Sequence, residues 1–114
     1  MTNKENILRF LGLAMRASKV VSGCDAAVSA VLEGEAKIII FAEDISRNTM
    51  SKILDAVESS DFEPPMAYRF AQSFDLGNAL GKPKRAVVVV TDKGFADKLA
   101  AMLDDYDEKI VTEE

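Results

Sequence analysis

The sequence predicts an α/β fold in which helices cover both faces of a four-stranded sheet, an α/β/α sandwich. Segments with helical spacing of apolar residues alternate with short apolar runs, which is typical of that class. The two longest apolar runs, 38–42 and 86–90, have the composition of strands that are covered on both faces. With 114 residues, of which 48% are hydrophobic, the chain has the size of one domain and can bury a core.

The first third of the chain is predicted to form two helices separated by a short strand. A Thr-x-x-Glu capping box and apolar residues at helical spacing predict the first helix over residues 2–17. Residues 19–21 are a strand candidate. The second helix follows a Ser22-x-x-Asp25 cap and ends near Gly34, and its predicted buried face comprises Cys24, Ala27, Val28 and Val31.

The middle of the chain is predicted to contain the central strand and a third helix. Residues 37–42 form a continuous β-branched and aromatic run, the pattern of a central strand. Ser46 or Asn48 is expected to cap the helix that follows. The predicted buried face of this helix comprises Met50, Ile53, Leu54 and Val57.

The rest of the chain is predicted to add two strands, 66–70 and 86–91, with a short helix over 74–80 between them. A last helix follows, and its buried face is defined by Phe95, Leu99, Met102 and Leu103. We therefore predict one domain over 1–103 and an acidic C-terminal tail over 104–114. This tail is expected to be a solvated, frayed terminus.

Composition excludes several classes of function. The chain has no His and a single Cys, so we expect no metal site, no internal disulfide and no cofactor. Its apolar runs are far shorter than the roughly 20 residues that span a bilayer, which predicts no membrane association. No signal-peptide pattern is found, and a lone Cys fits a reducing compartment. The expected location is the cytoplasm.

The distribution of charge qualifies the net charge of −5, which by itself argues against a nucleic-acid partner. Basic residues concentrate in 1–22 and 64–100, whereas acidic residues concentrate in 23–63 and 101–114. The charge is therefore segregated, and basic segments remain available for binding phosphate.

Three segments are candidate binding sites. Ser22 and Gly23 stand between a strand and a helix, where backbone N–H groups can receive an anion. Glu43 and Asp44 follow the central strand, where open α/β sheets usually bind ligands. The loop 81–85 precedes a buried strand and holds the densest group of cations in the chain, Lys82, Lys84 and Arg85.

Each segment also has a purely structural interpretation. Ser22 and Gly23 can simply begin a helix, the acidic pair can cap one, and the basic loop can be solvated. Cys24 could have a depressed pKa at a helix start, but we expect it to pack in the core as a small apolar residue.

Six motifs that occur together and in order resemble those of the kink-turn RNA-binding ribosomal protein superfamily, the L-seven-Ae and L-thirty-e group. Within it they are similar to the bacterial YlxQ-type branch. The resemblance extends from Ile7 to about Leu103. The motifs are Leu11-Gly-Leu-Ala-Met-Arg-Ala-Ser-Lys19, Val21-Ser-Gly23, Gly34-Glu-Ala-Lys37, Ala42-Glu-Asp-Ile-Ser-Arg-Asn-Thr49, Leu76-Gly-Asn-Ala-Leu-Gly-Lys-Pro83 and Thr91-Asp-Lys-Gly-Phe-Ala96.

The resemblance implies a three-layer α/β/α sandwich with a mixed four-stranded sheet, and a bacterial, non-enzymatic protein associated with the ribosome or translation. Members of this family bind a kinked RNA helix with the three segments described above. Tight RNA turns expose crowded phosphates and base edges, which suit a basic loop and a few polar groups. The implied RNA-binding residues are Lys19, Ser22, Gly23, Asp25, Ser29, Glu43, Asp44, Lys82, Lys84 and Arg85.

The second helix departs from the family pattern. RNA-binding members carry Asn-Glu-x-x-Lys there, whereas the matching positions here are Asp25, Ala26 and Ser29, and Glu33 replaces a common basic residue. The first hypothesis is therefore a kink-turn-type RNA-binding protein with a weakened or altered RNA face. The alternative is a protein-interaction module that has lost RNA binding, as the acidic growth-arrest and DNA-damage relatives suggest.

Overall fold

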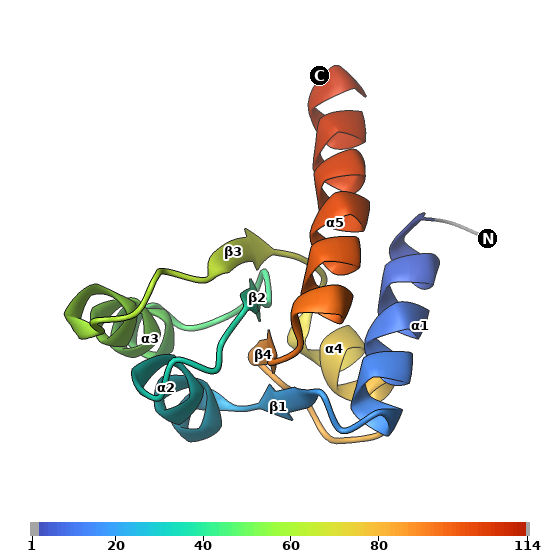
Figure 1. The fold of residues 1–114 in the computed structure, drawn as a ribbon. Coiled ribbons are helices and arrows are strands. Elements are labelled where there is room, and N and C mark those ends of the chain that lie inside the picture. Colours follow the sequence, from blue (N-terminus) through green and yellow to red (C-terminus); the bar gives the residue numbers. More distant parts are fainter. Residues whose placement is uncertain (1–2, 114) are drawn as a thin grey trace.

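The computed structural model describes the backbone of residues 3–113 and the side chains of residues 3–106. Helices and strands alternate along the chain, which confirms the predicted α/β fold (Figure 1). Thr2 of the predicted capping box lies outside the described residues. The elements are α1 (Asn3–Arg16), β1 (Val20–Ser22), α2 (Cys24–Leu32), β2 (Ile38–Phe41), α3 (Arg47–Ser59), β3 (Met66–Arg69), α4 (Ser73–Ala79), β4 (Val87–Val90) and α5 (Lys93–Glu113).

The four strands form one mixed sheet in the order β1-β4-β2-β3. Strand β4 runs antiparallel to both of its neighbours, whereas β2 and β3 are parallel. In this register Ser22 pairs with Val88, and Phe41 pairs with both Val87 and Arg69. The ends of β1, β2 and β3 therefore meet the start of β4 at one edge, which we call the carboxyl edge. We call the other end of the sheet, where β1, β2 and β3 begin and β4 ends, the opposite edge.

Helices cover the sheet on both sides. Helices α1, α4 and α5 pack on one face, and α2 and α3 pack on the other (Figure 1). Every residue of β2 and β4 is buried, as the apolar runs predicted. Alternate strand residues supply the two halves of the core, with Ile38, Ile40, Val88 and Val90 on the first face and Ile39, Phe41, Val87 and Val89 on the second.

The second and third helices begin differently. Gly23 is the N-cap of α2 and makes no side-chain capping bond, so the predicted Ser22 cap is wrong. The Ser46 hydroxyl caps α3 by accepting a hydrogen bond from the Thr49 amide at 3.1 Å, which confirms one of the two predicted caps. Leu54 was expected in the core but is 43% exposed, because Ala56 occupies the buried face of α3 instead.

The last helix continues well past Leu103 and includes most of the segment predicted to fray. The Tyr106 ring packs edge-on against Phe70, with centroids 5.3 Å apart. The Tyr68 hydroxyl donates a 2.6 Å hydrogen bond to Asp104. The predicted boundary between 103 and 104 therefore falls inside α5, and residues as far as Tyr106 belong to the packed domain.

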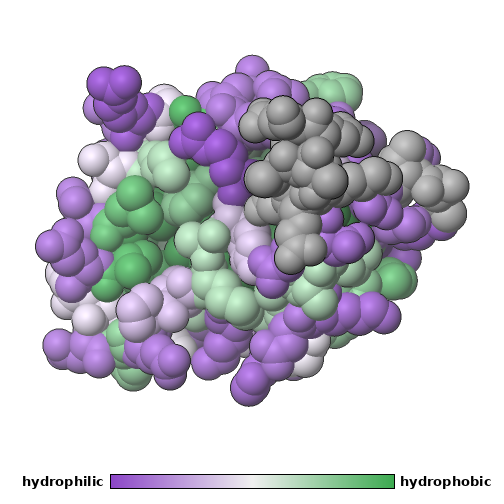
Figure 2. Space-filling view, turned by 90° about the horizontal axis from the view of Figure 1, so that it is seen from above, coloured by the Kyte–Doolittle hydropathy of each residue, from purple (hydrophilic) through white to green (hydrophobic). Residues whose placement is uncertain are grey.

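Strand β3 is the exposed border of the sheet, and its residues are exposed or half-buried. Seen from above, the molecule shows hydrophobic surface on its left, the side on which α3 lies in Figure 1, with polar side chains around it (Figure 2). A groove of about 480 Å³ lies there between α3 and β3, lined by Ile45, Arg47, Met50, Ser51, Leu54 and Arg69. Among the described residues, no helix is both long enough and apolar enough to cross a membrane.

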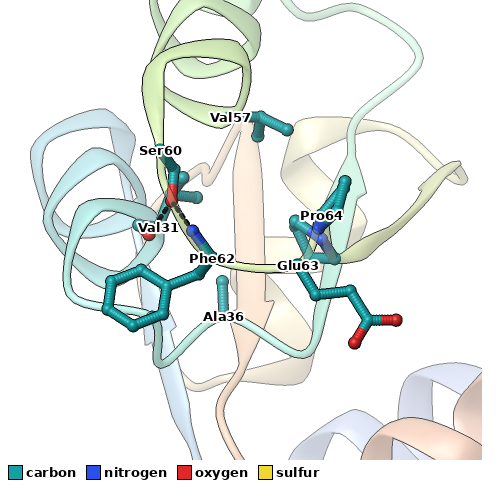
Figure 3. Close-up of a pocket in the computed structure, with 9 residues that line it drawn as sticks. Val31, Ala36, Val57, Ser60, Phe62, Glu63 and Pro64 are labelled. Carbon is teal, nitrogen blue, oxygen red and sulfur yellow. Dashed lines mark hydrogen bonds between the residues drawn. The ribbon is translucent and has the colours of Figure 1, made fainter.

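The opposite edge is closed by the segment that joins α3 to β3. The Ser60 hydroxyl donates to the Val31 carbonyl at 3.5 Å and accepts from the Phe62 amide at 3.1 Å (Figure 3). The pocket beneath holds only about 10 Å³, enough for roughly one water molecule. On its outer side the same segment borders an open pocket of about 440 Å³ that extends to Lys93 and Asp97.

Candidate nucleic-acid interface

The helix start after β1 and the basic loop before β4 meet at the carboxyl edge. Arg85 Nε donates a 3.0 Å hydrogen bond to Ser22 Oγ. The Gly23 amide donates to the Val87 carbonyl at 3.0 Å. Gly23 adopts φ 94°, a conformation that side-chain-bearing residues rarely adopt, and so it turns the chain from β1 directly into α2. Two of the three predicted segments thus form one continuous surface.

An open pocket of about 540 Å³ lies between these two segments, and we call it the edge pocket. Five of the residues predicted from the sequence line it: Ser22, Gly23, Asp25, Lys84 and Arg85. Four others were not predicted as binding residues: Cys24, Ala26, Thr49 and Ala86. Its walls combine two cations, hydroxyl groups and one carboxylate, which suits a partner that carries both negative charge and hydrogen-bonding groups.

The basic loop is held against α4 by backbone contacts. The Lys82 amide donates to the Gly77 carbonyl at 2.9 Å, and the Arg85 amide donates to the Ser73 carbonyl at 3.0 Å. A Cβ atom at Gly77 would overlap the Pro83 carbonyl oxygen, so this close approach requires glycine. The loop therefore runs along α4, and these contacts fix the backbone from which its cations project.

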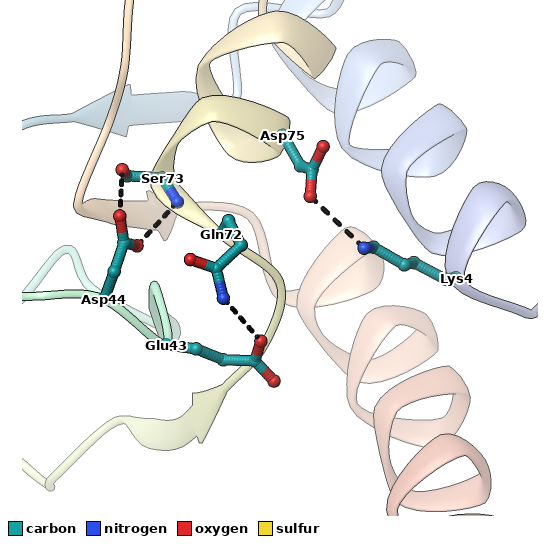
Figure 4. Close-up of polar contacts among 6 residues, drawn as sticks. All are labelled: Lys4, Glu43, Asp44, Gln72, Ser73 and Asp75. Atoms are coloured by element: carbon teal, nitrogen blue, oxygen red, sulfur yellow. Dashed lines mark hydrogen bonds and ion pairs between the residues drawn. The ribbon is translucent and has the colours of Figure 1, made fainter.

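The acidic loop after β2 is tied to the start of α4 (Figure 4). The two Asp44 carboxylate oxygens accept hydrogen bonds from the Ser73 amide at 2.8 Å and from its hydroxyl at 2.7 Å. These bonds, and to a smaller extent the charge of Lys84, lower the pKa of Asp44 below its ordinary value, although desolvation opposes them. Glu43 accepts a 3.1 Å hydrogen bond from Gln72. The acidic pair thus has a structural role at the carboxyl edge.

The exposed face of α2 is partly acidic. Asp25 lines the edge pocket, and Ser29 and Glu33 follow at intervals of one turn. The Ser29 hydroxyl donates a 3.0 Å hydrogen bond to the Glu33 carboxylate. This bond occupies the side chain that stands at the family's lysine position.

Five of the ten predicted residues do not line the edge pocket: Ser29, Glu43 and Asp44, described above, and also Lys19 and Lys82. Lys19 precedes β1 at the opposite edge, where its carbonyl accepts a hydrogen bond from the Thr91 amide at 2.9 Å. Lys82 is exposed beside Gly77 and does not line the pocket. The structure thus brings Lys84 and Arg85 together with the start of α2, and it places Lys19 at the far end of β1.

Of the four lining residues that were not predicted, Thr49 and Cys24 carry polar side chains, and their signals in the sequence are weak. Thr49 lies in the first turn of α3, where its hydroxyl accepts a 2.9 Å hydrogen bond from Ser46, and local pattern gives no sign that it reaches the edge pocket. Cys24 packs partly against the core, as predicted, and also reaches the edge pocket. Among the described residues, no group of three or more His, Cys, Asp or Glu side chains is placed to hold a metal ion.

Comparisons with known proteins identify the family of the chain. Residues 5–100 match the model of the Ribosomal protein L7Ae/L30e/S12e/Gadd45 family. The chain is 43% identical over 95 residues to the RNA-binding protein YlxQ of Bacillus subtilis, covering 82% of this chain and 91% of that protein.

Two solved structures share the fold. The structure of a protein with unknown function from Bacillus halodurans C is 36% identical, with a TM-score of 0.77 over 86% of this chain and 96% of that one. The Giardia lamblia 15.5kD RNA binding protein is 17% identical, with a TM-score of 0.66 over 93% of this chain and 88% of that one, which shows the fold alone. Taken with the family match and the YlxQ relative, the chain belongs to the ribosomal protein L7Ae/L30e/S12e/Gadd45 family and to its YlxQ-type branch.

Proposed function

We propose that this chain is a non-enzymatic RNA-binding protein that holds a kinked RNA helix at the carboxyl edge. The observation that carries the proposal is the edge pocket, in which Lys84 and Arg85 face the start of α2. The B. subtilis relative is named an RNA-binding protein, which supports the same partner. We place its activity in the bacterial cytoplasm, in association with the ribosome or translation.

The chemistry of the edge pocket fits a bent RNA better than a straight duplex. Lys84 and Arg85 supply charge for phosphates, which positions RNA without reading its sequence. Ser22, Thr49 and Asp25 supply hydroxyl and carboxylate groups that can bond base edges. Base edges become accessible where RNA is kinked or unpaired, because the A-form major groove is too deep and narrow for side chains to read.

One observation favours the alternative of a protein-interaction module. The Ser29 hydroxyl is bonded to Glu33, so the outer turns of α2 present an acidic surface that repels phosphate. In our proposal this surface limits the affinity for RNA and leaves the edge pocket as the contact. In the alternative, the same surface receives a basic protein partner.

The experiment is a binding series with the full chain, using a kink-turn RNA and a straight duplex of equal length and composition. Affinity is measured between about 50 and 200 mM salt. The logarithm of the binding constant falls with the logarithm of the salt concentration, and each phosphate contact on a duplex contributes about 0.9 to the size of that slope. We expect tighter binding to the kinked RNA at every salt concentration. Equal binding to both RNAs would indicate charge attraction alone, and binding to neither would favour the protein-interaction module.

A further inference from the structure

Phe74 is the most exposed of the large hydrophobic side chains in the described part of the chain, at 67% of its surface. Helix α4 buries the stripe formed by Ser73, Leu76 and Gly77, with Leu80 just beyond it. Phe74 lies outside that stripe, so packing of α4 gives no reason for an aromatic residue there. Single exposed apolar residues are common, so exposure alone does not indicate a function. Phe74 is distinguished by its position in the fold.

Phe74 stands beside the carboxyl edge and on a fixed base. Its neighbour Ser73 is buried, bonds the Asp44 carboxylate through both amide and hydroxyl, and accepts the Arg85 amide through its carbonyl. The first turn of α4 is therefore anchored to two of the loops that form the carboxyl edge. An aromatic ring on such a turn loses little conformational freedom when it binds a ligand.

The basic loop lies between the edge pocket and α4, the helix that carries Phe74. Lys84 and Arg85 line the pocket on the α2 and α3 side, while the backbone of the same loop runs along α4 through Gly77 and Ser73. An RNA strand whose phosphates follow this loop has its edge-pocket contacts on one side and the first turn of α4, which carries Phe74, on the other. Aromatic side chains beside cations are the usual means of holding unpaired bases.

We propose that Phe74 is a stacking platform for an unpaired base of the RNA that occupies the edge pocket. This inference rests on the proposed function and extends the RNA contact across the basic loop to α4. Stacking on Phe74 adds affinity for RNA with an unpaired nucleotide at the bend, and it does so without a charge contact.

The test compares Phe74→Ala with Phe62→Ala in binding to a kink-turn RNA. Phe62 is the matched control because it is 54% exposed and lies at the opposite edge, beside the small pocket (Figure 3). Removal of one stacked base corresponds to a fall in affinity of about 5- to 150-fold, so we expect that fall for Phe74→Ala alone. Because the ring carries no charge, the salt slope of Phe74→Ala should equal that of the parent.

A second measurement reports the ring directly. The chain contains two Tyr and no Trp, so Phe74→Trp introduces one tryptophan that can be excited selectively and whose emission a stacked base quenches. Kink-turn RNA should quench the emission of the Phe74→Trp variant and leave that of the Phe62→Trp control unchanged. The same RNA with abasic residues in the bend should quench neither variant.

Three outcomes would overturn the stacking role. Unchanged affinity of Phe74→Ala, while Lys82→Glu with Lys84→Glu still weakens binding, rejects it and leaves the RNA-binding function intact. A changed salt slope would mean that Phe74 acts by holding the basic loop. Emission of the Phe74→Trp variant that saturating RNA leaves unchanged would show that no base stacks at position 74. Failure of the parent chain to bind RNA would instead reject the proposed function itself, and the stacking role with it.

Discussion

Arg85 and Ser22 join the two ends of the edge pocket, because Arg85 Nε donates a 3.0 Å hydrogen bond to Ser22 Oγ across 63 positions of the chain. Arg85 is half-buried, and its Nη1 also donates to the Lys84 carbonyl at 3.1 Å. The guanidinium therefore fixes the distance between the basic loop and the start of α2. Arg85 therefore differs from Lys82 and Lys84, whose side chains are exposed.

The first prediction concerns this bond. Ser22→Ala and Arg85→Lys should each lower the free energy of unfolding, and a double-mutant cycle should show coupling of about 1 kcal/mol, the usual net value of a hydrogen bond. Urea unfolding of the parent, the two single variants and the double variant gives the coupling. Strictly additive effects would show that the bond contributes nothing to stability.

The second prediction concerns the exposed cations. Lys82→Glu with Lys84→Glu should change the free energy of unfolding by less than about 0.5 kcal/mol, because neither side chain packs. It should weaken RNA binding and flatten the salt slope by about 0.9 for each duplex phosphate that is no longer bound, or about 0.7 for a single strand.

The control for this charge reversal is Lys19→Glu with Lys37→Glu, which makes the same change of charge at the opposite edge. A Debye length of about 8 Å at physiological salt screens that edge from the edge pocket. Equal weakening by the two double variants would show that the basic loop is not the RNA contact.

The third prediction is a gain of binding. Ser29→Lys with Glu33→Arg removes the exposed Ser29–Glu33 hydrogen bond and replaces one repulsive group by two cationic donors. Each well-placed new contact contributes on the order of 1 to 3 kcal/mol, so affinity for the kinked RNA should rise more than affinity for a duplex. Filter binding or fluorescence anisotropy with both RNAs measures the difference.

The matched control is Asp55→Arg with Ser59→Lys, which makes the same change of charge at two exposed positions one turn apart on α3. A gain for α2 alone would identify α2 as the element that limits RNA affinity. Equal gains in RNA affinity from the α2 and α3 variants would show that added positive charge alone causes the effect. No gain from the α2 variant would favour the protein-interaction module.

The fourth prediction concerns Gly77, where a Cβ atom would overlap the Pro83 carbonyl oxygen. Gly77→Ala should lower the free energy of unfolding by about 1 to 3 kcal/mol, as overpacking does, and should weaken RNA binding by displacing the basic loop. Gly94→Ala is the control, since its Cβ would meet only the Asp92 side chain, at 3.2 Å. Parent-like stability of Gly77→Ala would mean that the loop adjusts without cost.

The fifth prediction concerns pH. The hydrogen bonds from Ser73 hold the pKa of Asp44 below its ordinary value of 3.8. A pKa lowered by folding stabilises the protein above the ordinary value, and that stabilisation is lost as pH falls through the lower folded value. The parent should therefore be more stable than Asp44→Asn near neutral pH, and the difference should shrink below about pH 4.

Urea unfolding of both proteins across this range measures the difference, and Asp55→Asn controls for removal of one exposed carboxylate. A difference between parent and Asp44→Asn that stays constant down to about pH 2 would exclude ionised Asp44 as its source.

The elements of the fold could be predicted because their signals are local. The runs Ile38–Phe41 and Val87–Val90 are apolar on both faces and were identified as buried strands. The packing of Tyr106 on Phe70 was not predicted, because an acidic composition after Leu103 concealed an aromatic contact between distant parts of the chain. Contacts between distant residues depend on the assembled fold, and local pattern does not encode them.

The candidate site likewise contains residues that local sequence identifies and contacts that depend on the assembled fold. Composition alone identified Lys84 and Arg85, and the position between strand and helix identified Ser22. The sequence did not show that Arg85 bonds Ser22, because this bond depends on how the basic loop lies along α4. It did not show that Phe74 faces solvent, because this depends on which face of α4 is buried. A hydroxyl that looks like a local helix cap was instead used by a guanidinium from another segment.

The central place of β4 in the sheet sets the order in which the chain can assemble during synthesis. Strand β1 lies next to β4, and β4 separates it from β2, although β4 is the last strand to be made. A nascent chain can pair β2 with β3 first, yet β1 finds its neighbour only after Val90 has emerged. The apolar face of α1, which packs against α4 and α5, is therefore exposed until those late elements are made, and an exposed apolar face of this kind favours early chaperone contact.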